Sequence, residues 1–592
     1  MNRARREKSV ARTTPDSGLN RSSWKEAWVR AACSPWGLAL FGAALYWLSL
    51  PPAKQPWAAY VACGLWVAII ARDTAPTRGE YWRIWWVSTA MWLALLQGIR
   101  LASWPLYFGW VALSLYAAVY LPLFIGMARS LHHGFRFPLP VAAAVAWVGC
   151  ELLRAYFATG FAACMLAHSQ VPWPWMLPIA SHLGSYGVSL LVMFLSALAW
   201  EWLDWVFWKR KILARHVSVA FLSRQSTFTL LAAVAVIASV LSLSWHDRWI
   251  AEQSPIKPLA RILLIQEDMP TVFDGPPENY LLGWNRYERQ TSLAAEAVGE
   301  NGVDLVVWPE STFSRLVPWI DRDRQAAWQT DVAPDRIREI EEWMDVKAKR
   351  ISSIFRNKPP LFLLGQDVVR LTDSGTRQFN AALWLDSEHV EEAEYYAKRH
   401  LVMFGEYIPF LATFTPQWLS GLGLPNLDAG DGPKAWRLRG GATVSCSICF
   451  EDVLPHVIHS HVRGLTDLGK SPDMLVNLTN DAWFRGSSIL DHHLNNAILV
   501  AVENRRPMLV AANTGISAWI DGNGRVIRAL PYPEAGFILA EPIPDGRWGW
   551  WQSVGDWPVR FLTVLCFLPT SLWLAKWFFW KRALPGPTEI KQ

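Results

Sequence analysis

The sequence is short of charge and of cysteine. Only 18% of its 592 residues are Asp, Glu, Lys or Arg, whereas soluble domains carry about 25%. Its 7 cysteines are too few to form a disulfide framework in so long a chain. No heptad or Gly-X-Y repeat is sustained, which excludes coiled-coil and collagen-like chains. Because 52% of the residues are hydrophobic and 38 are tryptophan, the composition predicts a membrane protein.

The hydrophobic residues gather in long runs. Crossing a bilayer takes about 20 apolar residues, and eight runs are candidate spans, of which the first is slightly short. They cover about 34–50, 55–71, 82–99, 105–127, 139–162, 185–207, 226–246 and 557–579.

Lysine and arginine favour one set of connecting segments. The N-terminal arm (1–33) and the loops at 72–83, 129–136 and 209–224 are basic, whereas the loop at 161–184 holds no Lys or Arg. Cytoplasmic loops carry this excess, so we expect a cytoplasmic N-terminus and an external segment after the seventh run. The net charge of +6 therefore indicates a membrane rather than nucleic acid as partner.

Residues 258–545 have the composition of a soluble domain and alternate between strand and helix patterns. Predicted strands are Arg261–Gln266, Asp304–Trp308, Leu361–Gln366, Gln378–Leu385, Ala442–Cys449, Met474–Leu478 and Met508–Ala512, with a hairpin over Ser517–Ile527. Predicted helices are Glu278–Val298, Asp335–Lys349 and Ile489–Asn504. The pattern predicts a layered α/β domain inserted between a helical membrane domain (34–257) and a last span with a cytoplasmic tail (546–592).

Three short segments put a carboxylate, an amine and a thiol where strands are expected to end. Glu310 follows a strand stopped by Pro309, Lys398 precedes a His-Leu-Val run, and Cys449 leaves an apolar strand. Open α/β sheets build their sites at such ends. A carboxylate can take the proton of a thiol, and an ammonium with a backbone N–H can stabilise an oxyanion. Together the three residues would suit acyl transfer, although each alone is ordinarily a solvated charge or a core residue.

The order of these segments resembles the Glu–Lys–Cys constellation of the nitrilase superfamily, and with the spans the chain resembles apolipoprotein N-acyltransferases from about residue 80 to 580. In the α/β region the matching motifs are WPE (308–310), KRHLVMFGEYIP (398–409), ICFE (448–451), NDAWF (480–484) and ENRRP (503–507). In the helical region they are ELLR (151–154), TGF (159–161), HSQ (168–170) and YGVS (186–189).

The resemblance implies a nitrilase-like αββα sandwich. It further implies that Glu310 is the general base, Lys398 the oxyanion partner and Cys449 the nucleophile, with supporting roles for Glu406, Phe450 and Glu451. The implied reaction is a ping-pong transfer without cofactor or metal ion. Cys449 takes an acyl chain from a membrane phospholipid and passes it to the α-amine of a lipoprotein's diacylglyceryl-cysteine. The implied location is the bacterial inner membrane, with the catalytic domain on the periplasmic side.

The chain departs from the family pattern at several places. Phe450 stands where Tyr is common, Met403 where Pro is usual, and Glu267-Asp268-Met269 replace a Gly-Asn-Ile run. The stretch 315–357 is longer than usual, and we expect an accessory helix there.

Other interpretations remain open beside this one. The protein could be a membrane-tethered amidase acting on small C–N substrates, or a non-catalytic membrane scaffold. Cys446 and Cys449 could form a redox or metal pair, although a lone CxxC lacks the second half of a zinc site. The segment Pro409–Gly441 is either a lipid-facing lid or an ordinary loop.

Two pairs of polar residues carry separate expectations. His492 and His493 precede a helical run without a metal-binding pattern, and we expect a surface pair. Glu151 and Arg154 are spaced to pair on one helix face, and such a pair is either functional or structural.

Overall fold

The computed structural model describes residues 29–583 apart from 30, 103, 105, 210–218, 254–256, 270–277, 300–301, 314–318, 323–333, 357, 373–374, 387–388, 391–392, 404 and 408–425. Most of the basic N-terminal arm, part of the 209–224 loop and half of the Pro409–Gly441 segment therefore lie outside the described residues.

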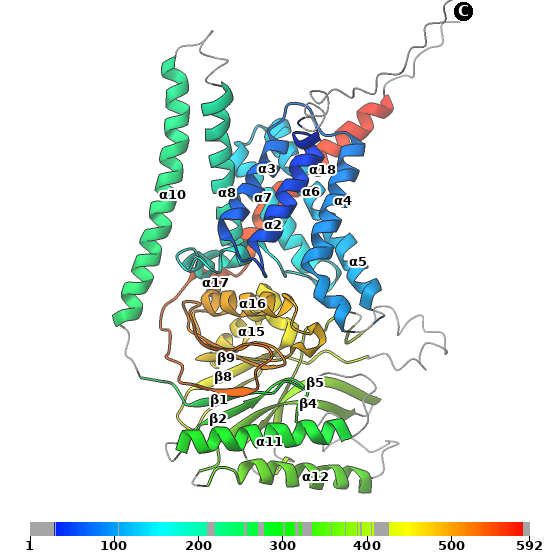
Figure 1. The fold of residues 1–592 in the computed structure, drawn as a ribbon, viewed down its shortest axis with the longest axis vertical. Coiled ribbons are helices and arrows are strands. Elements are labelled where there is room, and N and C mark those ends of the chain that lie inside the picture. The colour runs from blue at the N-terminus through cyan, green and yellow to red at the C-terminus, as the bar shows by residue number, and fades with distance from the viewer. Residues whose placement is uncertain are drawn as a thin grey trace, which may run out of the picture.

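The helical part forms a bundle at one end of the molecule (Figure 1). Its helices are α2 (Pro35–Ser49), α3 (Pro56–Ile70), α4 (Arg78–Leu95), α5 (Leu106–Ala118), α6 (Tyr120–Arg129), α7 (Leu139–Tyr156), α8 (Ala180–Asp204), α10 (Val219–Gln253), α17 (Trp550–Val554) and α18 (Trp557–Ala583). Polar caps mark several starts: the Ser34 side chain accepts from the Gly37 N–H at 3.2 Å, and Thr77 and Glu80 form a capping box.

In the described part of the chain, 3 helical stretches are long and apolar enough to cross a membrane: Leu106–Gly134, Leu139–Thr159 and Leu177–Phe207. Shorter apolar helices cover Pro56–Ile70, Leu231–Asp247 and Trp557–Leu568. The count of eight spans stays a prediction.

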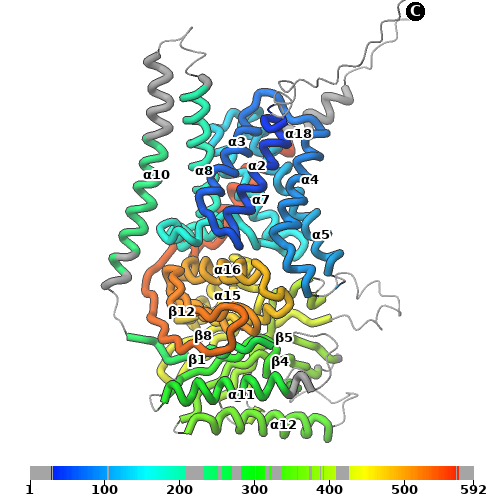
Figure 2. The backbone as a smooth tube through the Cα atoms, in the orientation of Figure 1, coloured from blue at the N-terminus to red at the C-terminus, as the bar shows by residue number. Residues whose placement is uncertain are grey.

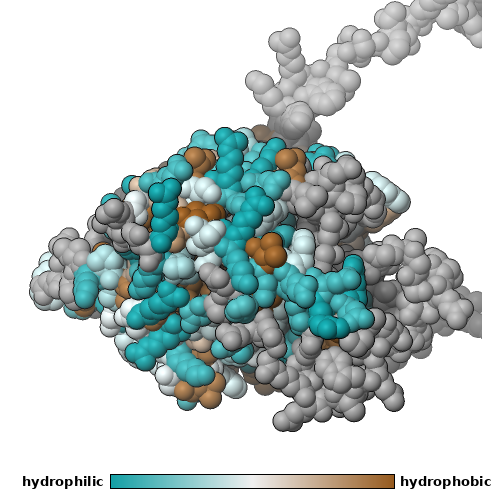
Figure 3. Space-filling view, turned by 90° about the horizontal axis from the view of Figure 1, so that it is seen from below, coloured by the Kyte–Doolittle hydropathy of each residue, from teal (hydrophilic) through white to brown (hydrophobic). Residues whose placement is uncertain are grey.

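Large apolar side chains cover the outside of this bundle. Exposed examples are Trp57, Trp82, Trp86, Trp104, Phe108, Leu231, Trp245, Phe561 and Leu568. The opposite end of the molecule presents mainly hydrophilic side chains (Figure 3). Extended apolar surface on a soluble protein would be a liability, so this distribution supports membrane association of the helical end.

Two mixed sheets make up the α/β part. In the first, with 7 strands among the described residues, the order is β13 (Gly536–Ala540), β1 (Ile262–Gln266), β2 (Leu305–Trp308), β4 (Leu361–Thr372), β5 (Gly375–Leu385) and β6 (Glu394–Ala397), with β3 (Trp319–Arg322) paired to β4. In the second the order is β12 (Val526–Leu530), β11 (Ser517–Ile520), β10 (Met508–Asn513), β9 (Met474–Asn480), β8 (Thr443–Ile448) and β7 (Ala435–Arg437). Each sheet has three parallel strands at its centre, β1, β2 and β4 or β8, β9 and β10.

The sheets pack face to face and carry helices on their outer faces. Strand side chains from both sheets form one core, in which Trp384 of β5 stacks on Trp436 of β7 with ring centroids 5.1 Å apart. Helices α11 (Glu278–Val298) and α12 (Pro334–Ser352) cover the first sheet. Helices α15 (Pro455–Asp467) and α16 (Ile489–Asn504) cover the second and face the bundle (Figure 1). The predicted αββα sandwich is thus confirmed, and α12 is the helix expected in 315–357.

The sandwich is entered once and left once by the chain: it follows α10 and precedes α17 and α18 (Figure 2). Side chains of α15, α16 and the second sheet share one apolar core with the bundle. Polar contacts reinforce this junction, since Glu503 accepts from the N–H and hydroxyl of Ser185 at 2.7 and 2.6 Å, and Arg505 pairs with Asp247. The two parts are therefore packed together firmly.

The Glu151 and Arg154 side chains on α7 do not make the predicted pair. Glu151 accepts from Trp147 Nε1 at 2.9 Å and from the Leu166 N–H at 2.8 Å. Arg154 donates to the Ala163 carbonyl at 2.8 Å and lies over the Trp92 ring. The prediction was wrong because the segment after α7 provides other partners for Glu151 and Arg154, namely the Leu166 N–H and the Ala163 carbonyl. The spacing of residues along one helix does not reveal partners outside that helix.

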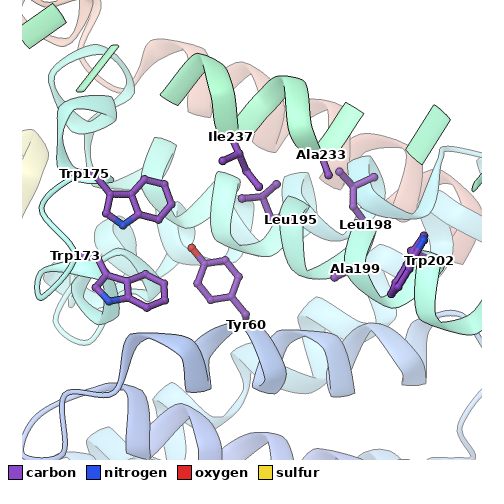
Figure 4. A pocket seen from close by; sticks show the side chains of 9 residues that line it. All are labelled: Tyr60, Trp173, Trp175, Leu195, Leu198, Ala199, Trp202, Ala233 and Ile237. Carbon is purple, nitrogen blue, oxygen red and sulfur yellow. The ribbon is translucent and has the colours of Figure 1, made fainter. Parts of the chain in front are cut away.

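A cavity of about 420 Å³ opens between α3, α8 and α10 (Figure 4). It is lined by Tyr60, Trp173, Trp175, Leu195, Leu198, Ala199, Trp202, Ala233 and Ile237. This lining contains none of the predicted site residues, so the cavity is separate from the strand ends considered next.

Candidate active site

Sheet topology brings Glu310 and Lys398 to one edge of the first sheet. Glu310 follows β2, and Lys398 follows β6. Because β4 is parallel to β2 and two antiparallel steps lead from β4 to β6, β2 and β6 run in the same direction. Their carboxyl ends therefore meet at the same edge, where Lys398 Nζ lies 3.8 Å from Glu310 Oε1.

Glu310 is buried and held at both oxygens. Its Oε1 accepts from Asn380 Nδ2 at 2.7 Å, and its Oε2 accepts from the Asn480 N–H at 2.9 Å. Burial raises the pKa of Glu310, Lys398 lowers it and the nearby Glu406 raises it, with a net value above the ordinary one. Such a carboxylate is a stronger base than an exposed one.

Lys398 is 1% exposed and sits between two carboxylates. Its Nζ donates to Glu406 Oε1 at 2.8 Å, and Glu406 also accepts from Asn380 Nδ2 and the Val402 N–H. The adjacent carboxylates raise the pKa of Lys398 in spite of burial, and Lys398 lowers the pKa of Glu406. The site therefore holds a fixed cation, which can stabilise an oxyanion, beside a carboxylate that can accept a proton.

Cys449 leaves β8 in a left-handed conformation, with φ of 50°. Non-glycine residues adopt this conformation at a cost of about 1–2 kcal/mol, and it is frequent at functional turns. Burial raises the pKa of the Cys449 thiol to about 12, and Glu310 raises it while Lys398 and His493 lower it. The thiol is thus protonated at rest, and its ionisation needs a base such as Glu310.

Glu451 organises the turn that carries the nucleophile. It is fully buried and accepts from the Tyr396 hydroxyl, from the Arg399 and His400 N–H groups, and from the Ile448 N–H at 2.8 Å. One carboxylate thereby ties the start of the Lys398 loop to the end of β8. These contacts support the predicted supporting role of Glu451 and indicate that this role is structural.

Phe450 connects this turn to the bundle. It is partly buried against the apolar core that the bundle shares with α15 and α16, and its ring stacks near that of His400. Leu454, a few residues on, lies against Gly160 of the loop after α7. The candidate site therefore lies at the junction between the sandwich and the membrane helices.

Several residues of this site were not singled out by sequence reasoning. Asn380 bridges Glu310 and Glu406, and Asn477 Nδ2 donates to the Cys449 carbonyl at 3.1 Å. Asn480 was noted only as part of a motif. Asn380 lies in the middle of β5, Asn477 in the middle of β9, and Asn480 at the end of β9. Buried polar residues within otherwise apolar strands are the signal that could have found them.

The prediction that His492 and His493 form a surface pair was wrong. His492 is buried, with Nδ1 3.6 Å from Cys164 Sγ. His493 lies between Asp452 and Asp481, with a ring nitrogen 3.0 Å from an oxygen of each. Asp481 and Asp452 lie 12 and 41 residues before His493, outside the helix, so its local pattern could not reveal them.

The CxxC interpretation gains no support from the geometry. Cys446 is buried in the core between the sheets, whereas Cys449 is half-buried at the strand end. Among the described residues, no group of three or more His, Cys, Asp or Glu side chains is arranged to hold a metal ion.

Two family models match the chain. Residues 42–198 match the apolipoprotein N-acyltransferase N-terminal domain, and residues 277–544 match carbon-nitrogen hydrolase. A solved amidase from Nesterenkonia sp. is similar at 15% identity with a TM-score of 0.32, over 51% of this chain and 95% of that one.

Curated relatives match along nearly the whole length. An apolipoprotein N-acyltransferase from Rhodopirellula baltica is 30% identical over 590 residues, covering 93% of this chain and 98% of the relative. Apolipoprotein N-acyltransferase 1 from Treponema denticola is 25% identical, covering 89% and 93%. Both parts of the molecule thus match in the same order within single relatives, and the chain belongs to the apolipoprotein N-acyltransferase family.

Proposed function

We propose that this protein N-acylates lipoproteins through a thioester on Cys449. The observation that carries the proposal is the buried Glu310–Lys398–Glu406 cluster, of which Glu310 and Lys398 act electrostatically on the half-buried Cys449 thiol. The acyl donor is a membrane phospholipid, and the acceptor is the α-amine of the diacylglyceryl-cysteine at a lipoprotein's N-terminus.

In the first half-reaction the Cys449 thiol gives its proton to Glu310, and the sulfur attacks the ester carbonyl carbon of the phospholipid. Lys398 Nζ and a backbone N–H of the Cys449 turn stabilise the oxyanion. The C–O bond to the glycerol then breaks, and Glu310 returns the proton to the departing oxygen. The products are a lysophospholipid and an acyl-thioester enzyme.

In the second half-reaction the lipoprotein amine attacks the thioester carbonyl and gives a proton to Glu310. The C–S bond breaks as the amide forms, and the proton returns to the sulfur. The enzyme is then free for another cycle, which is a ping-pong sequence.

Water would turn this transferase into a hydrolase. Phe450 packs on the apolar core of the bundle beside the nucleophile, and an apolar site at the bilayer surface excludes water from the thioester. This supports acyl transfer over the alternative of a membrane-tethered amidase. The buried charge cluster also argues against a non-catalytic scaffold, since burying charges is costly even when they are paired.

We place the sandwich on the periplasmic side of the bacterial inner membrane. The proposal follows from the basic N-terminal arm and basic alternate loops, which favour the cytoplasm. The sandwich follows α10 and precedes α18, so it lies on the side opposite the N-terminus if seven spans precede it.

The test uses purified protein in detergent with a phospholipid that carries an alkyne-tagged acyl chain. Wild type should transfer the tag to a synthetic diacylglyceryl-cysteine peptide as a hydroxylamine-resistant amide, and Cys449→Ala should not. Cys446→Ala, which changes a buried thiol on the strand that leads to Cys449, is the matched control and should retain transfer. Release of the tag only as free fatty acid would instead establish a hydrolase.

A further inference from the structure

His493 lies next to the backbone of the nucleophile, and the mechanism above gives it no role. It lies on α16, and its side chain is 11% exposed. Nδ1 is 3.0 Å from Asp481 Oδ1, and Nε2 is 3.0 Å from Asp452 Oδ1. Nε2 is also 3.3 Å from the carbonyl oxygen of Cys449.

These contacts define the protonation of the ring. Ionised carboxylates and backbone carbonyls only accept hydrogen bonds, so an imidazole facing them at both nitrogens carries a proton on each. The two carboxylates raise the pKa of His493 well above its ordinary value in spite of burial. The side chains of Asp452 and Asp481 are 0% and 3% exposed, so water screens this cation poorly.

The same contacts hold the backbone of the nucleophile. The Cys449 carbonyl accepts from Asn477 Nδ2 at 3.1 Å and from His493 Nε2. In a trans peptide the next N–H points opposite to the carbonyl. Fixing this carbonyl therefore also fixes the direction of the Phe450 N–H, and it holds Cys449 in its left-handed conformation.

We propose that His493 is a positioning residue for Cys449: held as a cation between Asp452 and Asp481, it fixes the Cys449–Phe450 peptide and supplies positive charge near the thiol. The importance of this role for acyl transfer rests on the function proposed above. Other charged groups also act on the thiol: Glu310 and Lys398 from the first sheet, and Asp481 from the end of β9.

The experiment measures the alkylation of Cys449 by iodoacetamide, which needs no lipid. The full chain in detergent carries Cys33→Ala, because Cys33 is exposed, and the modified Cys449 peptide is quantified by mass spectrometry between pH 6 and 10. Below the thiol pKa the rate is proportional to the thiolate fraction, so one unit of pKa is tenfold in rate. We expect His493→Gln to alkylate at least about tenfold more slowly at every pH in this range.

Two further variants separate charge from simple packing. His492→Gln changes the neighbouring buried histidine on the same helix and should stay within about twofold of wild type. His493→Gln combined with Asp481→Asn removes a cation and an anion together, and should recover about threefold or more of the lost rate. If the melting temperature shows that His493→Gln does not fold, the proposal is tested with Asp481→Asn alone. We then expect Cys449 of Asp481→Asn to be alkylated at least about threefold faster than in wild type.

Alkylation of His493→Gln at the wild-type rate would overturn the proposal, as would a double variant no faster than the single one. In the fallback case, alkylation of Asp481→Asn no faster than wild type would overturn it. If the expected alkylation pattern appears while the tagged phospholipid never labels Cys449, the acyl-transfer function fails and the role of His493 stands.

Discussion

Glu406 sets the strength of the proposed base through its contacts with Lys398 and Asn380. Its Oε1 accepts from Lys398 Nζ at 2.8 Å and from Asn380 Nδ2 at 2.9 Å, and Asn380 Nδ2 also donates to Glu310 at 2.7 Å. Glu406→Gln removes one negative charge and leaves Glu310 as the only carboxylate of the cluster. The neighbouring Lys398 then stabilises the ionised form of Glu310 without opposition, so the pKa of Glu310 should fall.

The magnitude follows from the shared donor. Two oxygens bound to one nitrogen at these distances lie within about 6 Å of each other. At an effective dielectric constant of about 20, two like charges at that separation repel by about 3 kcal/mol, which corresponds to about two pKa units. A weaker base also takes the thiol proton less readily, so the maximal rate should fall roughly tenfold or more.

The assay is single-turnover formation of the acyl-enzyme from tagged phospholipid between pH 4 and 9. The acid limb of the profile reports protonation of Glu310, and we expect Glu406→Gln to move it toward lower pH by one to two units, on the order of the shift above. A melting curve controls for the lost bond to the Val402 N–H. An acid limb that stays in place while the rate falls would refute the electrostatic role of Glu406.

Three other substitutions test buried charged residues of the site and of its junction with the bundle. Lys398→Met should reduce acyl-enzyme formation by about 10²-fold or more. It should also move the acid limb to higher pH, opposite to Glu406→Gln, because the two remaining carboxylates repel each other. The same single-turnover profile measures both effects. Glu451→Gln turns an amide N–H toward backbone donors and should lower stability by about 2 kcal/mol, seen as a reduced melting temperature together with slower acylation. Burial raises the pKa of Glu503 from 4.5 to about 7, so its contribution to stability is fully present below about pH 4.5 and is lost as the pH rises through 7, by about 3 kcal/mol. Glu503→Gln should therefore flatten the dependence of the melting temperature on pH above 4.5. An unchanged dependence would contradict the raised pKa of Glu503.

Much of the sandwich could be predicted because its central strands are continuous apolar runs. The runs at β1, β2, β9 and β10 are buried on both faces, and such strands are typical of parallel sheets covered by helices. The helices α11 and α16 begin and end where their apolar periodicity predicts. The hairpin of β11 and β12 follows from its Asp-Gly-Asn-Gly turn.

The short strands escaped prediction because partners distant in sequence stabilise them. β7 has 3 residues and β6 has 4, and β13 pairs with β1 across the whole domain. Prediction of the site is limited in the same way, by partners that are distant in sequence. Glu310 and Cys449 lie at the ends of strands that the sequence predicts. The place of Lys398 after β6, and the contacts of Asn380, His493 and Glu451, depend on which strands pair.

The most direct test of the account is to locate the acyl group on the protein. Wild-type protein is incubated with a phospholipid of defined acyl chain, quenched in acid and digested, and the peptide that contains Cys449 is analysed by mass spectrometry. The account predicts that this peptide carries the mass of the acyl chain and loses it in hydroxylamine, and that Glu310→Gln accumulates far less of the adduct. An acyl group found on another residue, or an equal amount of adduct in Cys449→Ala, would contradict the assignment of Cys449 as nucleophile.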